Sequence, residues 1–422
     1  MQGVIIAAGQ SSRFWPMNQQ HKALVHIMGK PLIWYTIRSL FSVGIKEIIV
    51  VQAANRMVEK ELSRWPIKGL TLRFEIQEEP RGTGDAILHA KKWIKERFIV
   101  LNAEHLDVSL YAKKIFKEKD DIVLVCSETK NPELYGILSV DGDRVVRLVE
   151  KPAKNESPSN LKLWGMHILT PDFLDCLAKE QSHPYSLIFA LSKYAGTHAV
   201  KYEKLQGSGF TLKFPWDIFG VRDFIFKNYL KKRIEKRSKI HKSVILKGDI
   251  YISEGAQIQE YSIIEGPCFI GKNCIIGKQN VLRGPLNLED DIHTGTGMEI
   301  KNSVIGSGTH FHSGYVGDSF IGSDCRFGAG FVAANRRIDR GNIIVKVKGE
   351  KIDTGSSYFG FACGPRTKFG IHAETMPGVL IGRDCIIGPH TTVKDNIEDG
   401  KKVYTVSRQE IQEDNIWPAE KK

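Results

Sequence analysis

The sequence has few cysteines, and none of them is arranged for a disulfide framework or a zinc site. Seven cysteines occur among 422 residues, and no two stand in Cys-x-x-Cys spacing. An odd number without that spacing disfavours both uses, so we interpret them as reduced, buried thiols. Long apolar runs are missing too, because none approaches the roughly 20 residues that a membrane-spanning helix requires. We therefore expect neither a disulfide-stabilised secreted scaffold nor an integral membrane protein.

The first residues, MQGVIIAAGQ, have no basic leader before their apolar run and no cleavage pattern after it. We interpret them as a β-strand rather than a signal peptide, and the expected location is the cytoplasm. The formal charge of +12 favours an anionic partner. Because the basic residues lack the interleaved aromatics of single-strand nucleic-acid platforms, we expect a nucleotide or sugar phosphate rather than nucleic acid.

The first half of the chain alternates strand-like and helix-like segments. This alternation predicts an α/β domain with a mainly parallel sheet covered by helices. Ligands bind beyond the carboxyl ends of the strands in such a sheet, and VLNAEHLD places Glu104 at such an end. The expected strands are residues 3–8, 47–52, 72–77, 97–102 and 121–126, and the expected helices are residues 30–44 and 84–97.

The second half has a period of six residues. One aliphatic residue per six, often followed by glycine, is typical of a parallel β-helix built from hexapeptide repeats. The phase resumes late in the chain at Phe369, Ile381, Ile387 and Val393. The uninterrupted series is Leu246, Ile252, Ile258, Ile264, Ile270, Ile276, Leu282 and Leu288.

The six-residue period is interrupted over residues 333–365, which form a basic stretch. We predict that this stretch is a loop outside the coil and that it contributes to a binding site. The tail after the last repeat is expected to pack on the coil or fray. These changes of pattern divide the chain into four parts. They are an N-terminal α/β domain (1–228), a basic linker helix (229–242), a β-helix (243–402) and a C-terminal tail (403–422).

Two motifs of the first half have the character of nucleotide-binding turns. AAGQSSRF follows the first strand, and its small residues would let backbone N–H groups approach a phosphate near Arg13. QEEPRGTGDAI supplies a second glycine turn before a helix, with Gln77 upstream to pair with the edge of a base. Each motif alone is more typical of an ordinary turn.

Together with GKPLI, NPELYGIL, LVEKP and PWD, these motifs resemble the sugar-1-phosphate nucleotidylyltransferases. The resemblance implies a Rossmann-like domain in which Arg13 and Lys22 are catalytic and Glu104 and Asp217 share Mg²⁺. It implies that Gly136, Glu150 and Lys151 bind the sugar phosphate. The implied nucleotide-binding residues are Ala8, Gly9, Ser11, Arg13, Gln77, Gly82 and Thr83.

The chain departs from the family pattern at two positions of this half. It has Ala103 and Glu104 where the family usually has Gly-Asp, and the longer Glu changes the reach of a ligand to Mg²⁺, which demands near-ideal geometry. It has Leu163 where the family usually has an Asn, and an aliphatic side chain cannot hydrogen-bond an N-acetyl group. These departures leave the sugar open.

The stretch HSGYVGDSFIGSDCRFGAGFVAAN, with VKVKGEKIDTG and MPGVLIG later, is similar to the acetyltransferase domain of the bifunctional N-acetylglucosamine-1-phosphate uridylyltransferase/glucosamine-1-phosphate acetyltransferase family, especially its archaeal-type members. The resemblance implies a left-handed β-helix, a homotrimer and acetyl-CoA as co-substrate. A base must deprotonate the attacking amine, and His suits that task. The implied residues are His312 as base, Tyr315, Asn335, Lys346 and Lys348 for the sugar phosphate, and Ala329 and Arg408 for acetyl-CoA.

Arg326 replaces an Asn of the bacterial pattern, and His310 stands two residues before His312, which we interpret as an accident of a polar corner. The expected activity is Mg²⁺-dependent nucleotidyl transfer from UTP to a sugar 1-phosphate, with N-acetylation of an amino-sugar 1-phosphate in the β-helix. One alternative keeps only nucleotidyl transfer, from UTP or dTTP, with the β-helix for trimerisation. Another is a non-catalytic regulatory subunit that binds nucleotide sugars.

Overall fold

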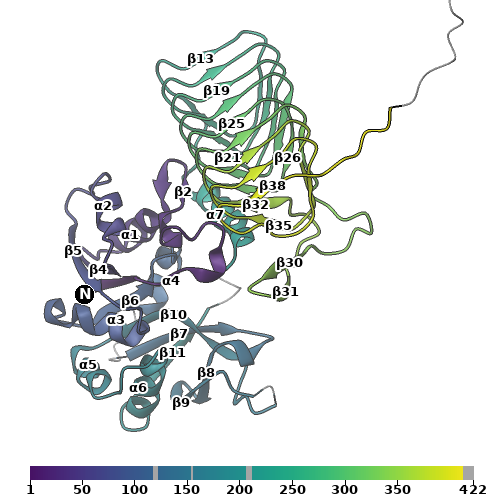
Figure 1. Ribbon diagram of the computed structural model, residues 1–422. Helices are drawn as coiled ribbons and strands as arrows, with labels where there is room; N and C mark the ends of the chain where they lie inside the picture. Colours follow the sequence, from purple (N-terminus) through teal and green to yellow (C-terminus); the bar gives the residue numbers. More distant parts are fainter. Residues whose placement is uncertain (117–121, 154, 206–211, 412–422) are drawn as a thin grey trace, which may run out of the picture.

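The computed structural model describes residues 1–422 except 117–121, 154, 206–211 and 412–422. It has an N-terminal α/β domain beside a long coil of short strands (Figure 1). All seven cysteines are free thiols and six are buried, as predicted. Among the described residues, no helix combines the length and apolar character needed to cross a membrane.

One nine-stranded sheet forms the core of the N-terminal domain, and its strands are the five that the sequence predicts plus four more. Its order is β5 (Thr71–Gln77), β4 (Glu47–Ala53), β1 (Gln2–Ala7), β6 (Phe98–Asn102), β10 (Leu161–Leu169), β7 (Ile122–Glu128), β11 (Val200–Lys204), β9 (Arg144–Glu150) and β8 (Gly136–Asp141). The helices are α1 (Leu32–Ser42), α2 (Met57–Leu62), α3 (Thr83–Ala90), α4 (Val108–Ile115), α5 (Pro171–Ala178), α6 (Ser186–Ala195) and α7 (Ile218–Tyr229).

The prediction of a mainly parallel sheet is confirmed for one half of this sheet only. Strands β5, β4, β1 and β6 are parallel neighbours, whereas β10 runs antiparallel to both β6 and β7. Strands β8 and β9 form an antiparallel hairpin. Because β1 and β6 are adjacent and parallel, the loop after β1 and the segment after β6 meet at one edge of the sheet.

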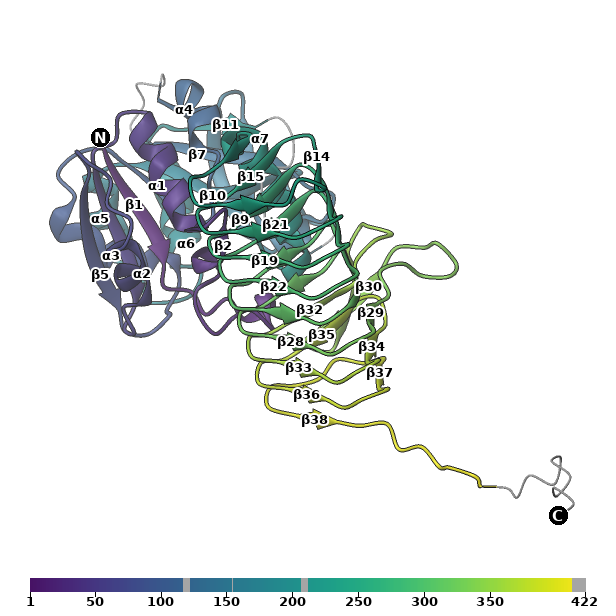
Figure 2. The same ribbon diagram turned by 90° about the horizontal axis from the view of Figure 1, so that it is seen from above.

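Three parallel sheets form the three faces of the coil, which Figure 2 shows as a stack of successive turns. The first face contains β12 (Arg233–Ile234), β15 (Ile250–Ile252), β18 (Cys268–Ile270), β21 (Leu286–Leu288), β24 (Val304–Ile305), β27 (Phe320–Ile321), β32 (Phe361–Cys363) and β35 (Val379–Ile381). The second contains β13 (Lys239–Ile240), β16 (Gln257–Ile258), β19 (Ile275–Ile276), β22 (His293–Thr294), β25 (His310–Phe311), β28 (Arg326–Phe327), β33 (Lys368–Phe369), β36 (Ile386–Ile387) and β38 (Lys402–Val403). The third contains β14 (Ile245–Lys247), β17 (Ile263–Glu265), β20 (Val281–Arg283), β23 (Met298–Lys301), β26 (Gly314–Gly317), β29 (Phe331–Ala333), β34 (Glu374–Thr375) and β37 (Thr392–Val393).

The hexapeptide prediction is confirmed by the register of the coil. Early turns pair residues that are 18 apart, such as Ile252 with Ile270, which is three faces of six residues each. The predicted aliphatic residues from Ile252 to Leu288 lie in one buried core inside the coil, and Phe369, Ile381, Ile387 and Val393 rejoin it. A fully buried aliphatic side chain contributes about 1.5–3 kcal/mol, so the repeat itself stabilises the coil.

The predicted linker helix over 229–242 is wrong. Helix α7 ends at Tyr229, and β12 and β13 already form the first turn of the coil. The sequence signal was present, since Ile234 and Ile240 continue the six-residue spacing backwards from Leu246. The charged residues between them had masked a pattern that needs only one aliphatic residue in six.

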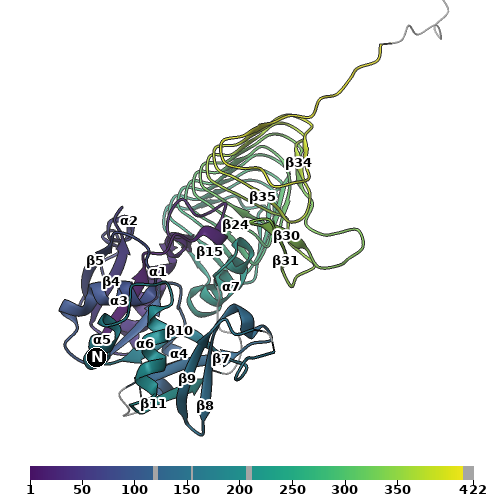
Figure 3. The ribbon, with the colours of Figure 1, turned by 60° about the horizontal axis from the view of Figure 1, so that its bottom comes forward.

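The excursion between β29 and β32 is confirmed, and part of it is ordered. It contains a two-stranded hairpin of β30 (Ile344–Val347) and β31 (Glu350–Asp353). The hairpin lies between the coil and the N-terminal domain (Figures 1 and 3). A buried apolar cluster spans both domains and includes Phe14, Leu32, Val221, Phe269, Phe320, Val345 and Phe359.

Candidate functional site

The loop after β1 forms a turn that is fixed by a hydrogen bond at Ser11 and by the burial of Phe14. Ser11 adopts a left-handed conformation with φ of 52°, and its hydroxyl accepts a hydrogen bond from the backbone N–H of Lys22 at 3.1 Å. Phe14 is buried in the cluster that spans both domains. A Cβ at Gly9 would meet no atom within 4 Å, so the chain leaves open space beside this backbone for a ligand.

Lys22 and Glu104 form a nearly buried ion pair at the edge of the sheet. Their Nζ and Oε1 atoms are 2.6 Å apart, and the Lys22 ammonium also donates to the carbonyl of Leu212 at 2.7 Å. Burial raises the pKa of the Glu104 carboxyl, but the charge and hydrogen bond of Lys22 together with the charges of His105 and His21 outweigh it and leave that pKa lowered. Glu104 is therefore an anion that is 9% exposed, at the end of the strand where the sequence placed it.

Asp217 lies in the short 3₁₀ turn (Pro215–Asp217) that leads into α7. Its Oδ2 accepts hydrogen bonds from the backbone N–H groups of Lys213 and Phe214 at 2.7 and 2.8 Å. Burial raises the pKa of this carboxyl although both hydrogen bonds lower it. The bonds fix the carboxylate, and in the part of the chain that the structure describes its Oδ1 makes no hydrogen bond and is available to a ligand.

Two cavities meet at the Lys22–Glu104 pair. A cavity of about 400 Å³ is lined by Gly9, Ser11, Gln77, Gly82 and Thr83, together with Lys22, Asn102 and Glu104. A cavity of about 850 Å³ is lined by Arg13 and Asp217 and shares Lys22, Asn102 and Glu104 with the first. The structure thus brings five of the predicted nucleotide residues together on one side of the ion pair, and Arg13 and both predicted metal carboxylates into the larger cavity. Ala8 is buried directly before the loop.

The glycine turn before α3 is set by its contacts. Gly82 has φ of 107°, and a Cβ there would lie 2.7 Å from Pro184 Cα, so no other residue fits. The Gln77 amide donates to the Gly82 carbonyl at 3.1 Å and to Asp85 Oδ2 at 2.7 Å. Because both of its N–H bonds serve the turn, the Gln77 carbonyl oxygen is the group left for a ligand.

The predicted sugar-phosphate residues of the first half lie on the β8–β9 hairpin. Gly136 and Glu150 are paired in register, burial raises the pKa of the Glu150 carboxyl, and Lys151 donates to the Tyr185 hydroxyl at 2.8 Å. In the described part of the chain these three do not line the larger cavity, whereas Tyr135 beside them does.

Several cavity residues were missed by sequence reasoning. Lys162 and Lys213 both line the larger cavity, and burial lowers the pKa of each ammonium, with Arg13 lowering that of Lys213 further. Leu163 and Trp164 lie beside them at a β-bulge of β10. No motif marks these lysines among the 60 basic residues, so only the fold could single them out.

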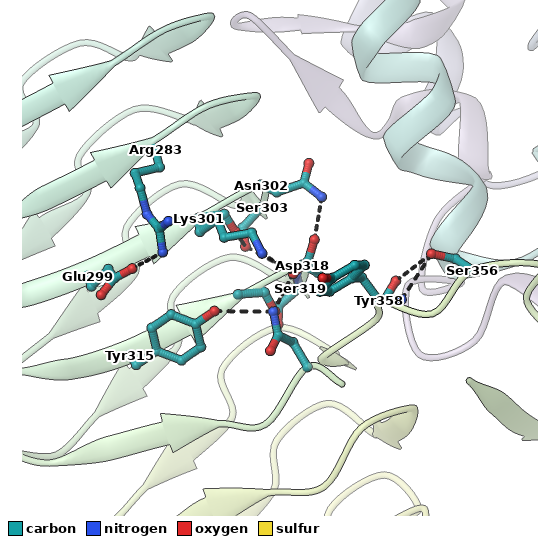
Figure 4. Close-up of polar contacts among 12 residues, drawn as sticks. Arg283, Glu299, Lys301, Asn302, Ser303, Tyr315, Asp318, Ser319, Ser356 and Tyr358 are labelled. Atoms are coloured by element: carbon teal, nitrogen blue, oxygen red, sulfur yellow. Dashed lines mark hydrogen bonds and ion pairs between the residues drawn. The ribbon is translucent and has the colours of Figure 1, made fainter. Parts of the chain in front are cut away.

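A second polar cluster lies on the third face of the coil, where Figure 4 shows side chains from successive turns meeting. Asn335 donates to the Tyr315 hydroxyl at 3.1 Å and also bonds Asp318. Lys301 pairs with Asp318 at 3.3 Å and lies 4.8 Å from the centre of the Tyr358 ring. The structure therefore brings the predicted residues Tyr315 and Asn335 together, around an Asp that the sequence did not single out.

The other predicted residues of the coil are more dispersed. His312 is exposed at the corner between β25 and β26, and Ala329 is half-buried. Arg408 lies in the exposed segment after β38. Lys346 is exposed on β30, while the Lys348 ammonium donates to Ser12 Oγ in the N-terminal domain at 2.8 Å. This places Lys348 in the larger cavity of the first half, whereas the sequence grouped it with Tyr315 and Asn335.

The two departures in the coil have structural partners. Arg326 donates to the carbonyl of Gly308 at 2.6 Å, so it is tied to the neighbouring turn. His310 lies beside His293, with ring centres 5.3 Å apart, and burial together with Arg326 lowers its pKa. His310 thus lies on strand β25 and not at a corner, and its ring contact is with His293 of the neighbouring turn.

Comparisons with known proteins cover almost the whole chain. Residues 2–210 match the family model "Nucleotidyl transferase". The chain is 33% identical over 417 residues to "Bifunctional protein GlmU" of Methanococcus maripaludis strain C7, covering 96% of this chain and 97% of the relative. It is 32% identical over 407 residues, 95% and 99% of the two chains, to the "Bifunctional sugar-1-phosphate nucleotidylyltransferase/acetyltransferase" of Sulfurisphaera tokodaii.

Among solved structures, UDP-glucose pyrophosphorylase complexed with UDP-glucose is 23% identical with a TM-score of 0.46, over 54% of this chain and 98% of that one. The relatives at 30% identity and above match almost end to end, through the nucleotide turns, the coil and its excursion. The chain belongs to the family of bifunctional GlmU-type sugar-1-phosphate nucleotidylyltransferases/acetyltransferases.

Proposed function

We propose that the N-terminal domain transfers a nucleotidyl group from UTP to a sugar 1-phosphate and releases pyrophosphate. The observation that carries the proposal is the Lys22–Glu104 pair at the junction of two cavities. The smaller cavity has the glycine turns and the Gln77 carbonyl, which accepts the imide N–H of a uracil. The larger one, lined by Arg13 and Lys348, takes the sugar phosphate and the phosphates that leave as pyrophosphate, so the two substrates meet at the pair.

In this reaction a phosphate oxygen of the sugar 1-phosphate attacks the α-phosphorus of UTP, and the bond to the bridging oxygen breaks as pyrophosphate leaves. Two anions must approach each other, so positive charge at the junction lowers the barrier. Lys22 lies at that junction and Arg13 beside it, and the loop of Gly9 and Ser11 offers backbone N–H groups to the triphosphate.

Mg²⁺ is the metal that this reaction uses, and the residues present fit it. Glu104 and Asp217 line one cavity, and Mg²⁺ is commonly held by one or two carboxylates together with substrate phosphates. Among the described residues no group of three His, Cys, Asp or Glu side chains gathers for a metal, which suits a metal that arrives with the nucleotide. When bound, Mg²⁺ neutralises phosphate charge.

The sugar 1-phosphate used by the N-terminal domain is an N-acetylated or related amino sugar, and the second half of the chain produces it. We propose that the coil transfers an acetyl group from acetyl-CoA to the amine of glucosamine 1-phosphate, with CoA leaving as the thiol. The exposed His312 accepts the amine proton, and Tyr315, Asn335 and Lys346 bind the sugar phosphate. Ala329 and Arg408 face acetyl-CoA, and Arg408 suits its phosphates because a guanidinium binds them bidentately.

We further propose a left-handed coil that forms a homotrimer, with each acetyl site between neighbouring coils. His312 and the segment that contains Arg408 are both exposed on a single coil, so a neighbouring coil supplies the opposite wall of the site.

Gln77 accepts thymine in the same way as uracil, so dTTP is the competing nucleotide. A coil that only forms the trimer is the second candidate, because Tyr315, Asn335 and Asp318 already satisfy one another.

The first experiment measures pyrophosphate release with Mg²⁺, UTP or dTTP and N-acetylglucosamine 1-phosphate. A parallel assay follows CoA thiol release with glucosamine 1-phosphate, for wild type and His312→Ala. Thiol release that disappears in His312→Ala establishes the acetyl site, and pyrophosphate release without thiol release leaves the coil as a trimerisation module. Absence of pyrophosphate release across a panel of sugar phosphates contradicts the proposed function.

A further inference from the structure

The β30–β31 hairpin belongs to the coil in sequence but is packed against the N-terminal domain. Its inward residues Val345 and Val347 are buried in the apolar cluster that also contains Phe14 and Leu212. On the coil side, Asn396 donates to the carbonyl of Lys346 at 2.7 Å. The hairpin is thus fixed from both domains.

The tip of the hairpin is a two-residue turn of Lys348 and Gly349, both with positive φ, 51° and 87°. Such a turn matches the twist of the two strands and keeps the hairpin tight. A lysine rarely adopts this conformation, yet it aims the side chain at the first domain. The Lys348 ammonium reaches Ser12 Oγ, at 2.8 Å, in the loop after β1.

The tip forms a wall of the larger cavity. Val347, Lys348, Glu350, Ile352 and Asp353 line it opposite residues of the first domain. In the described part of the chain, no carboxylate forms an ion pair with Lys348, whereas Lys22 in the same cavity is paired with Glu104. Because no described carboxylate pairs directly with this ammonium, which lies beside the loop proposed for the triphosphate, it is available for an anionic ligand.

We propose that Lys348 binds the triphosphate of the nucleotide, so that the nucleotidyl site of this chain is completed by a hairpin of the coil. The inference rests on the proposed function of the N-terminal domain. The Lys348 ammonium contacts the Ser11–Phe14 loop that also carries Arg13. It adds a point charge where pyrophosphate leaves. Lys348 consequently acts in the first reaction, not in acetyl transfer.

Lys348→Ala is the test variant, and Lys351→Ala is its matched control. Lys351 is an exposed lysine on β31 whose Cα pairs with that of Lys346, so its removal changes the hairpin's charge equally. We expect Lys348→Ala to raise KM for UTP at least roughly tenfold, as loss of a charge-assisted phosphate contact does, and to weaken UTP binding in equilibrium dialysis. Lys348→Arg restores part of the affinity, and thermal unfolding of the variants verifies that the hairpin is intact.

Lys348→Ala that matches Lys351→Ala in both KM and UTP binding overturns the inference while wild-type pyrophosphate release keeps the proposed function. Loss of thiol release in Lys348→Ala with unchanged UTP affinity also overturns it, because it returns the lysine to the acetyl site. If the wild type releases no pyrophosphate with any sugar phosphate, the proposed function fails. In that case, equilibrium dialysis of Lys348→Ala and Lys351→Ala with UTP still tests whether Lys348 binds the nucleotide.

Discussion

The two candidate sites are assembled in opposite ways. The first gathers residues that are far apart in sequence, such as Ser11, Glu104 and Asp217, at the ends of strands and at a helix start. The polar cluster of the second takes its residues from successive turns of one coil, between Lys301 and Asn335. The strand order of the sheet brings the residues of the first site together. The period of the repeat aligns the residues of the second.

The coil also shows where a repeat becomes available for chemistry. Early turns keep an 18-residue register and have their aliphatic residues in the core. Between β21 and β29 the register shortens to 17 or 16 residues, with Asn287 opposite Val304 and Met298 opposite Gly314, and the excursion comes next. The polar cluster of Tyr315 lies in this irregular region. Where the repeat is irregular, side chains that would otherwise pack in the core are therefore available for polar contacts.

The largest effect should separate the two sites completely. We expect Glu104→Ala to reduce pyrophosphate release on the order of 100-fold or more, because it removes the partner of Lys22 and a carboxylate proposed for Mg²⁺. Thiol release in the coil should stay unchanged. Glu78→Ala, which removes an exposed carboxylate directly after β5, is the control. Equal loss in both variants would refute a specific role for Glu104.

A core substitution in the coil should have the next largest effect. Phe327 stacks between Phe311 and Phe369, with ring centres 4.6 and 4.7 Å away. We expect Phe327→Ala to destabilise the coil by about 3–5 kcal/mol through lost burial and a cavity, measured by chemical denaturation. Phe189→Ala, at a side chain that is 45% exposed, should change stability little. A Phe327→Ala effect below about 1 kcal/mol would show that the coil does not depend on this stack.

A hydroxyl deletion at the second site should affect only acetyl transfer. Tyr315→Phe removes the acceptor of the Asn335 hydrogen bond and a proposed contact to the sugar phosphate. We expect thiol release to fall roughly tenfold, mostly through KM for glucosamine 1-phosphate, with pyrophosphate release unchanged. Tyr261→Phe, at a side chain that is 67% exposed on the coil, serves as control. Unchanged thiol release in Tyr315→Phe would favour a structural role for the cluster.

Periodicity and motifs made the coil and part of the first site predictable from the sequence. The six-residue repeat specified the coil, and the glycine turns with the strand into Glu104 specified which residues meet in the smaller cavity. Cavity residues without a motif were missed, such as Lys162 and Lys213, because their importance arises only when β10 and the start of α7 meet. Lys348 was assigned to the coil site, since nothing in a basic loop indicates across which domain boundary it folds.

The smallest effect concerns the interface between the two regions. Glu289 of the coil is buried and accepts hydrogen bonds from Gly29 N–H of the N-terminal domain, at 3.1 and 3.3 Å, and from the Asn287 amide at 2.8 Å. Burial raises the pKa of this carboxyl to about 7. The folded protein therefore binds a proton more tightly than the unfolded chain between the ordinary Glu pKa and about 7.

That difference sets the sign of a pH effect. Because the folded state holds more protons, the free energy of unfolding falls as pH rises from about 4.5 to about 7, by roughly 3 kcal/mol for this one group. Glu289→Gln removes this slope, so its stability relative to wild type should rise with pH and be greatest above pH 7. Thermal unfolding at pH 5 and pH 8 measures it, with Glu254→Gln on the exposed coil surface as control. A pH-independent difference would mean that the carboxyl is ionised throughout, and that the two regions meet around a charge rather than around a proton.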